Sequence, residues 1–236
     1  MELQEVVQTA KELILSTFPS CEAAFLGGSV VRNEATKTSD LDIVVFDLSV
    51  SASYRESFFY KSWPVEWYVH NLQSYQCFYE EDCKRARPSL PKMVSEGIIL
   101  QDKGNAVQLQ KEAKSLLLKG PEKWTEETII MKRYFLTDVL DDFIGATNRG
   151  EELFSAAALA ELLHEFVLRT NNQWIGSSKW IVRALKQHDP EFAEEFVQVF
   201  DHYYVTREKE AVISLVDRVL APFGGRLFDG FTLGKK

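Results

Sequence analysis

Cysteine and histidine are scarce in this sequence, and their scarcity limits the kinds of site that it can build. The 236 residues include three cysteines and four histidines. Cys21, Cys77 and Cys83 form no Cys-x-x-Cys pair, and an odd, widely spaced set is a poor disulfide framework. The histidines are scattered as well, so no zinc-type spacing is present. A metal ion held by this chain is therefore expected to be a hard cation bound by carboxylates.

Long apolar runs and an excess of basic charge are also missing. No run approaches the roughly 20 apolar residues of a membrane span, and residues 1–18 carry charges throughout, unlike a signal peptide. The net charge of -8, from 27 basic and 35 acidic residues, argues against nonspecific binding to nucleic acid or anionic membrane. We therefore expect a cytoplasmic protein with neither as its main partner, although a local phosphate pocket is compatible with this charge.

The first half of the chain mixes strand and helix signals. Apolar residues recur at helical spacing between Val6 and Ile14, which predicts an opening amphipathic helix that ends near Pro19. Pro64 separates two strand candidates and should lie at a strand end or in a turn. The strand candidates are 23–26, 41–46, 58–63 and 65–69, and further helices are expected over 72–86 and 105–119.

The character of the sequence changes after Lys119, where Gly120-Pro121 is a strong breaker. Beyond it no segment alternates with period two, and Asp189-Pro190 supplies a helix N-cap with a first-turn proline. Helices are expected over 125–147, 151–169, 178–187, 190–204 and 206–221. We predict an α+β fold with two domains, an N-terminal domain over 1–119 and an all-helical bundle over 120–236.

The chemistry is concentrated in a glycine turn that is followed by two paired aspartates. Gly27-Gly28-Ser29 follows a short apolar run, and glycines allow the backbone to turn sharply and to approach a phosphate without a Cβ in the way. Asp40 and Asp42 begin the next strand candidate, where side chains two residues apart share a face. Two adjacent carboxylates repel each other, so a divalent cation such as magnesium is their natural neutraliser.

Each of these signals is weak alone, since a lone Asp-x-Asp or Gly-Gly-Ser usually marks a turn. Together and in this order they resemble the signature of the DNA polymerase β-like nucleotidyltransferase superfamily. The form is that of the small bacterial enzymes that modify aminoglycosides and lincosamides, in which Gly-Ser, two residues, Arg-Gly-Glu-Ala and a short spacer precede Ser-Asp-x-Asp. The match runs from Gly28 to Asp42 and departs at Asn33, where the family usually has glycine. Because asparagine tolerates a left-handed backbone, we expect that turn to survive.

The resemblance implies a small mixed sheet with flanking helices in the N-terminal domain, and a set of site residues. The family's third carboxylate is expected at Glu66, as a metal ligand or as the group that activates the acceptor hydroxyl, with Asp47 and Glu56 as weaker rivals. Lys179, with Arg183 one helical turn further on, is a candidate for contacting the nucleotide phosphates, although a solvated lysine is as good an interpretation. The other implied nucleotide-binding residues are Gly27, Gly28, Ser29, Arg32 and Ser39, and the implied metal ligands are Asp40, Asp42 and Glu66.

The implied activity is magnesium-dependent transfer of a nucleoside monophosphate, of the 2.7.7 type. Two Mg²⁺ ions are expected during turnover, with ATP or another nucleoside triphosphate as donor and a hydroxyl of a small molecule as acceptor. Acids of the helical half could attract a cationic acceptor, as in aminoglycoside enzymes, but such a run is more often a solvated helix face. Modification of a protein acceptor and non-catalytic nucleotide binding on the same fold are the alternatives. The sequence leaves open a homodimer.

Overall fold

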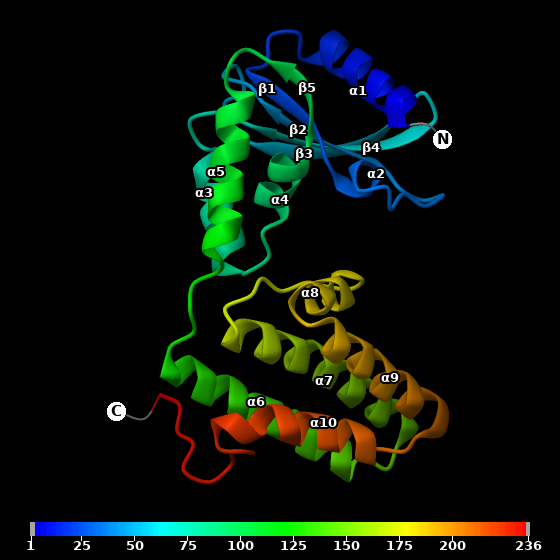
Figure 1. Cartoon of the computed structure of the whole chain (residues 1–236), viewed down its shortest axis with the longest axis vertical. Coiled ribbons are helices and arrows are strands. Elements are labelled where there is room, and N and C mark those ends of the chain that lie inside the picture. Colours follow the sequence, from blue (N-terminus) through cyan, green and yellow to red (C-terminus); the bar gives the residue numbers. More distant parts are fainter. Residues whose placement is uncertain (1–2, 235–236) are drawn as a thin grey trace. The chain divides into compact units, whose positions relative to one another are not determined.

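The computed structural model describes residues 3–234. Residues 1–2 of the predicted N-terminal domain and residues 235–236 of the predicted C-terminal domain therefore lie outside the described part. The chain divides into two compact units, Met1–Gly120 and Pro121–Lys236. The first unit contains a five-stranded sheet with helices, and the regular elements in the described part of the second unit are all helices (Figure 1). The predicted α+β fold is confirmed.

The sheet of the first unit is mixed and has the strand order β3-β4-β2-β1-β5. Strands β2 and β4 run parallel, and the other neighbouring pairs are antiparallel. The strands are β1 (Ala23–Leu26), β2 (Leu41–Phe46), β3 (Tyr54–Tyr60), β4 (Trp63–His70) and β5 (Ile98–Asp102). The central strands β1 and β2 are almost wholly buried, which agrees with their apolar sequences.

Each face of the sheet packs against helices, and each face has its own apolar core. Helix α1 (Leu3–Thr17) covers one face, where its Ala10 and Ile14 pack with the buried residues Ile43 and Val65 of the strands. The other face lies under α3 (Tyr75–Lys84), α4 (Ser89–Glu96) and α5 (Ala106–Lys119), as Figure 1 shows. Alternate residues of each strand therefore pack into one core or the other. Polar side chains of the strands can form a site only at an end of the sheet, beyond the helices that cover its two faces.

The hairpin between β3 and β4 corrects the expected strand bounds. Strand β3 covers Tyr54–Tyr60, not 58–63, and the turn lies at Lys61-Ser62, with Pro64 as the second residue of β4. Both turn residues have positive φ, as a type I′ hairpin turn requires. Lys61-Ser62 lacks the Asn-Gly or Asp-Gly pair that is typical of such a turn, and the turn was predicted at Pro64 because proline is rare inside strands. Strand β5 and helix α4 were not predicted.

The second unit is built from α6 (Glu126–Gly145), α7 (Arg149–Thr170), α8 (Trp180–His188), α9 (Pro190–Thr206) and α10 (Glu210–Leu220), followed by a short 3-10 helix, Ala221–Phe223. The expected cap at Asp189 is present, because its carboxylate accepts the backbone N–H groups of Glu191 and Phe192. Within residues 3–234, no helix combines the length and the apolar character needed to cross a membrane.

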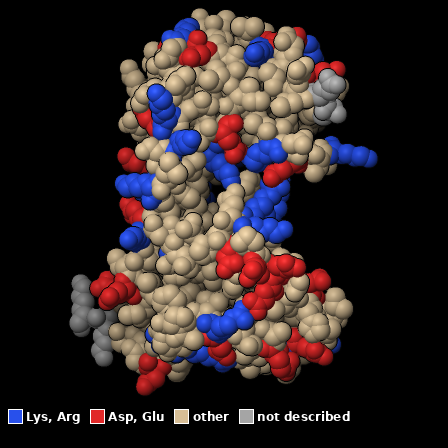
Figure 2. Space-filling view, viewed as in Figure 1, with Lys and Arg blue, Asp and Glu red and all other residues tan. Residues whose placement is uncertain are grey.

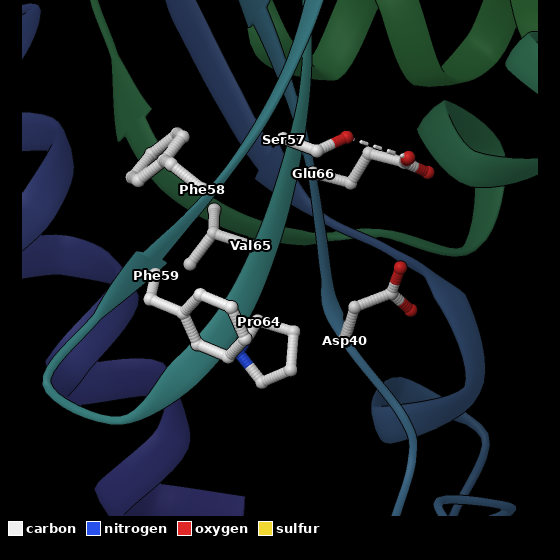
Figure 3. A pocket seen from close by; sticks show the side chains of 7 residues that line it. All are labelled: Asp40, Ser57, Phe58, Phe59, Pro64, Val65 and Glu66. Carbon is white, nitrogen blue, oxygen red and sulfur yellow. Dashed lines mark hydrogen bonds between the residues drawn. The ribbon is translucent and has the colours of Figure 1, made fainter.

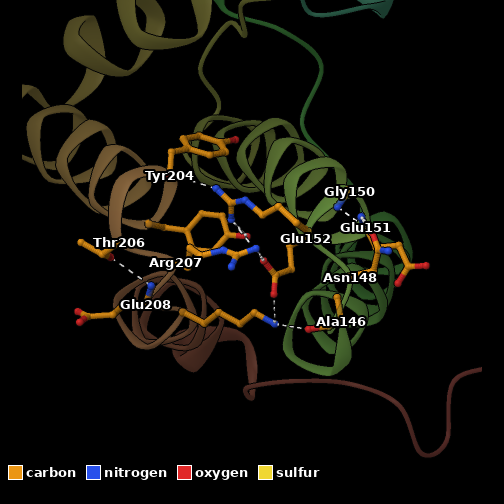
Figure 4. Close-up of polar contacts among 12 residues, drawn as sticks. Ala146, Asn148, Gly150, Glu151, Glu152, Tyr204, Thr206, Arg207 and Glu208 are labelled. Carbon is orange, nitrogen blue, oxygen red and sulfur yellow. Dashed lines mark hydrogen bonds and ion pairs between the residues drawn. The ribbon is translucent and has the colours of Figure 1, made fainter.

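A polar network joins the connections of this helical unit (Figure 4). The Glu152 side chain, only 12% exposed, faces Arg149, Arg207 and Lys209 at 3.3, 3.9 and 3.7 Å. Lys209 also donates to the Ala146 carbonyl at 2.6 Å, at the end of α6, where a cation complements the helix dipole. One carboxylate therefore ties the α6–α7 connection to the α9–α10 connection.

We expect His70, at the end of β4, to make the fold sensitive to acid. Burial lowers the pKa of His70 to about 4, and its Nε2 atom has no hydrogen-bond partner within residues 3–234. The unfolded chain takes up this proton near pH 6.5 and the folded chain does not, so stability falls as the pH decreases from about 6.5 to 4. At pH 5 the loss from this one group is about 2 kcal/mol.

The measurement is urea unfolding of wild type and of His70→Phe at pH 7.5 and pH 5. The difference between the two proteins isolates His70 from other groups that titrate in this range. The variant should lose less stability than wild type on acidification. Equal losses in the two proteins would contradict a buried, neutral His70.

Candidate functional site

Three carboxylates from two neighbouring strands converge at one end of the sheet. Asp42 is the second residue of β2, Asp40 lies just before that strand, and Glu66 is the register partner of Asp42 on the parallel strand β4. One carboxylate oxygen from each residue lies within 4.8 Å of the others. The rivals for the third acid lie elsewhere: Glu56 accepts the indole N–H of Trp67, and Asp47 caps the backbone N–H of Ser49.

The environment of Asp42 raises the free energy of its charged form. Burial, and then the charges of Asp40 and Glu66, raise the pKa of Asp42 to about 6. A raised carboxyl pKa means that too little positive charge lies nearby to stabilise the ionised form. A cation with oxygen ligands would supply that charge, so the residues present fit a magnesium ion.

Glu66 is held firmly and stays ionised. Ser57 Oγ donates to its Oε1 at 3.0 Å, Tyr68 Oη donates to its Oε2 at 2.7 Å, and Arg55 forms an ion pair with it at 2.5 Å. Burial alone would favour its protonated form, but the hydrogen bonds from Arg55, Tyr68 and Ser57 outweigh burial and lower its pKa. Glu66 is therefore a fixed anion and a weak base.

Sequence reasoning missed these three partners of Glu66. They lie at alternating positions of the hairpin, 55 and 57 on β3 and 68 on β4, on the face that carries Glu66. The register Ser57↔Glu66 follows from a turn at Lys61-Ser62. Placing that turn correctly would have found them.

The glycine turn packs directly against Asp42. Gly27 donates its backbone N–H to the Asp42 carbonyl at 2.8 Å. Gly28 has φ +76° and opens the short helix α2 (Gly28–Val31), and a Cβ at this position would overlap Asp42 Oδ2. Glycine is thus required at residue 28 both by its conformation and by the space that Asp42 occupies.

The remaining residues of the motif form a hydrogen-bonded loop after this turn. Ser29 Oγ donates to Ser39 Oγ at 3.1 Å, and Ser39 Oγ accepts the backbone N–H of Thr36 at 2.8 Å. Arg32 is ion-paired with Glu34 at 3.2 Å and with Glu96. The structure therefore brings Ser29 and Ser39 together, and it holds Arg32 by two acids.

Asn33 adopts the left-handed conformation that its place in the motif predicts, with φ 57°. Asparagine tolerates this region and a β-branched residue does not. We expect Asn33→Gly to leave stability within about 0.5 kcal/mol of wild type and Asn33→Val to lose about 1–2 kcal/mol. Thermal unfolding of the three proteins checks this, and equal midpoints for the Gly and Val variants would contradict it.

Lys179 and Arg183 belong to the second unit. Lys179 is the residue before α8, and the Arg183 guanidinium lies over the Trp180 ring at 4.8 Å from its centroid. Their contact with nucleotide phosphates stays a prediction.

Comparisons with known proteins agree with this geometry. Residues 8–76 match the family model described as a nucleotidyltransferase domain, and this range includes the glycine turn, Asp40, Asp42 and Glu66. A nucleotidyltransferase-like protein from Exiguobacterium sibiricum 255-15 is 13% identical, with a TM-score of 0.48 over 92% of this chain and 75% of that one, a likeness on which we rest no argument. No curated protein matches the chain. Residues 8–76 of the first unit are therefore similar to a nucleotidyltransferase domain, which agrees with the resemblance of the Gly28–Asp42 segment to the DNA polymerase β-like superfamily.

Proposed function

We propose that this protein transfers a nucleoside monophosphate, AMP from ATP in the first instance, to a hydroxyl of a small molecule and releases pyrophosphate. The observation that carries the proposal is the convergence of Asp40, Asp42 and Glu66 beside the Gly28 turn, within a nucleotidyltransferase domain. Nucleotidyl transfer depends mainly on holding the reactants in line and on offsetting the charge of the phosphates.

Asp40 and Asp42 are the residues proposed to hold magnesium, with Glu66 as the third ligand. Magnesium held by these residues would supply positive charge that offsets the charge of the leaving pyrophosphate. The backbone at Gly27-Gly28 and the hydroxyl of Ser29 are proposed to hold the outer phosphates, since Gly28 has no Cβ to keep them away. Lys179 and Arg183 of the second unit are proposed as further phosphate contacts.

The lowered pKa of Glu66 bears on its role. A carboxylate fixed by Arg55, Tyr68 and Ser57 is a better ligand and orienting group than a proton acceptor. We therefore place Glu66 in ligand binding and orientation of the acceptor hydroxyl, rather than in the removal of its proton.

Acids of the second unit give limited support to a strongly cationic acceptor. Asp and Glu predominate on the face of this unit seen in Figure 2. However, Glu165 is ion-paired with Lys132 at 2.8 Å, and Asp141 lies 3.5 Å from Arg226. Part of this negative charge is thus already neutralised within the unit, which favours the interpretation of a solvated helix face.

The test is release of pyrophosphate from each nucleoside triphosphate in the presence of Mg²⁺ and a panel of hydroxylated compounds, read together with mass spectrometry. A mass gain of one nucleoside monophosphate on a small molecule identifies donor and acceptor and supports the proposal. The same gain on a protein would move the assignment to a protein-modifying enzyme. Nucleotide binding without pyrophosphate release would make the protein a non-catalytic nucleotide-binding protein.

A further inference from the structure

A pocket of about 200 Å³ opens beside the carboxylates, on the β3–β4 hairpin (Figure 3). Asp40 and Glu66 lie on one side of it, and apolar side chains form the rest apart from Ser57. Its lining residues are Asp40, Ser57, Phe58, Phe59, Pro64, Val65 and Glu66. Because none of the Gly27–Ser29 turn lines it, an occupant of this pocket leaves that turn free for phosphates.

Strand register decides which of the apolar lining residues lie on the same face of the hairpin as Glu66 and which also pack into the core. Phe59 pairs with Pro64, two residues further along the hairpin than the Ser57↔Glu66 pair, so all four share one face. Phe58 and Val65 alternate to the other face, where Phe58 lies against the Trp67 ring with centroids 4.4 Å apart. We call Phe59 and Pro64 the apolar shelf.

The ring of Phe59 contributes little to folding. It is 78% exposed, on the edge strand of the sheet, and its partner across the hairpin is the Pro64 ring. Single exposed apolar side chains are common on protein surfaces and need no explanation by themselves. Phe59 differs from such residues because it lines a pocket that also holds two carboxylates of the proposed metal site.

The lining selects the chemistry of an occupant. Its two carboxylates are the proposed metal ligands, and it contains no lysine or arginine, so the lining carries no further charge to select an ionic ligand. The neighbouring side chain of Arg55 forms an ion pair with Glu66, so its charge is already balanced by that carboxylate. A flat apolar ring would rest on the shelf, while a hydroxyl on a short arm would reach the carboxylate end. The volume suits one ring rather than a multi-ring, drug-sized molecule, whose pockets are typically larger.

We propose that the acceptor is a small, uncharged alcohol that carries one apolar ring, and that the Phe59–Pro64 shelf binds this ring. The inference rests on the proposed function and narrows it to a substrate class. The proposed acceptor class therefore does not include polycationic sugars such as aminoglycosides. In the transfer, the acceptor oxygen bonds to the α-phosphorus, the bond from that phosphorus to pyrophosphate breaks, and the hydroxyl proton passes to solvent.

Binding can be tested without nucleotide, by saturation-transfer NMR on the full chain. The probes are benzyl alcohol, cyclohexylmethanol and glucosamine, and the proteins are wild type, Phe59→Ala, Phe59→Leu and Phe154→Ala. Phe154 is the matched control, since it is also 78% exposed but lies on α7. We expect both ring alcohols to bind wild type better than glucosamine does. Phe59→Ala should weaken this binding by roughly fivefold, Phe59→Leu by less, and Phe154→Ala not at all.

The outcomes separate this inference from the proposed function. Binding of the ring alcohols that depends on Phe59 supports the shelf as their binding site. Absence of pyrophosphate release with every compound would contradict the proposed function and leave that binding site intact. Transfer to glucosamine in preference to the ring alcohols, unchanged by Phe59→Ala, would overturn the inference and leave the proposed function intact. Ring binding equal in wild type and Phe59→Ala would overturn it too. So would a change of oligomeric state in Phe59→Ala without a change in probe binding, because the shelf would then be a protein contact.

Discussion

Replacing Asp42 with asparagine is expected to reduce nucleotidyl transfer by at least about a thousandfold and, at the same time, to make the metal-free protein more stable. The loss follows because the charge of Asp42 is proposed to hold the metal, and an amide cannot supply that charge. The amide is a near-isostere, so the packing beneath Gly28 is preserved. An unfolded variant would give the same loss for a different reason, and the stability measurement removes that ambiguity.

The gain in stability follows from the sign of the pKa shift. The pKa of Asp42 is about 6 in the folded protein and 3.8 for the unperturbed group, so the folded state binds this proton more tightly. Wild type is thus penalised above about pH 6, and the penalty fades as the pH decreases toward 4. At pH 7.5 in EDTA, the free energy of unfolding of Asp42→Asn should exceed that of wild type by about 3 kcal/mol.

Urea unfolding with EDTA and with Mg²⁺ completes this test. Magnesium should stabilise wild type more than the variant, since it neutralises the charge that the variant lacks. An Asp42→Asn protein with wild-type turnover would refute the assignment of Asp42. An inactive variant that is also less stable in EDTA would refute the account of charge repulsion.

Substituting Gly28 with alanine is expected to lower transfer by at least about a hundredfold, because the added methyl group must displace the Asp42 carboxylate. Gly104→Ala is the matched control. Gly104 also has a positive φ, +103°, but a Cβ there meets nothing within 4 Å. Both variants therefore pay a backbone penalty of about 1 kcal/mol, and only Gly28→Ala disturbs the site.

Steady-state rates and thermal midpoints of the two glycine variants separate these effects. Similar losses of stability with a selective loss of activity in Gly28→Ala are the expected pattern. Equal activity in the two variants would mean that the position of Asp42 relative to the turn is unimportant for the reaction.

Much of the site was predictable because its residues are close in sequence. Strands β1 and β2 are short apolar runs between clear breaks, and their observed bounds, Ala23–Leu26 and Leu41–Phe46, equal the predicted ones. The left-handed Asn33 was predictable as well, because few residues tolerate that conformation. Glu66 came from the resemblance, since nothing local marks an acid in β4 as a partner of β2.

The hairpin was less predictable, because its turn is built from Lys61 and Ser62, which carry no strong turn signal. With the turn misplaced, the register of β3 against β4 was lost, and with it the partners of Glu66 and the shelf. Strand β5 was missed because it is an edge strand of half-buried residues, Ile98–Asp102, without clear alternation. Long-range pairing of this kind is decided by tertiary contacts rather than by local preference.

The parallel pairing of β2 with β4 separates two parts of the site that could otherwise constrain each other. Asp42 and Glu66 lie on two paired inner strands, at a spacing fixed by backbone pairing. Phe59 and Pro64 lie near the tip of the β3–β4 hairpin, and β3 is an edge strand of the sheet. Residues near that tip can therefore be exchanged without moving the carboxylates. A library varied only at these two positions should yield enzymes that share one chemistry and differ in the alcohols they choose.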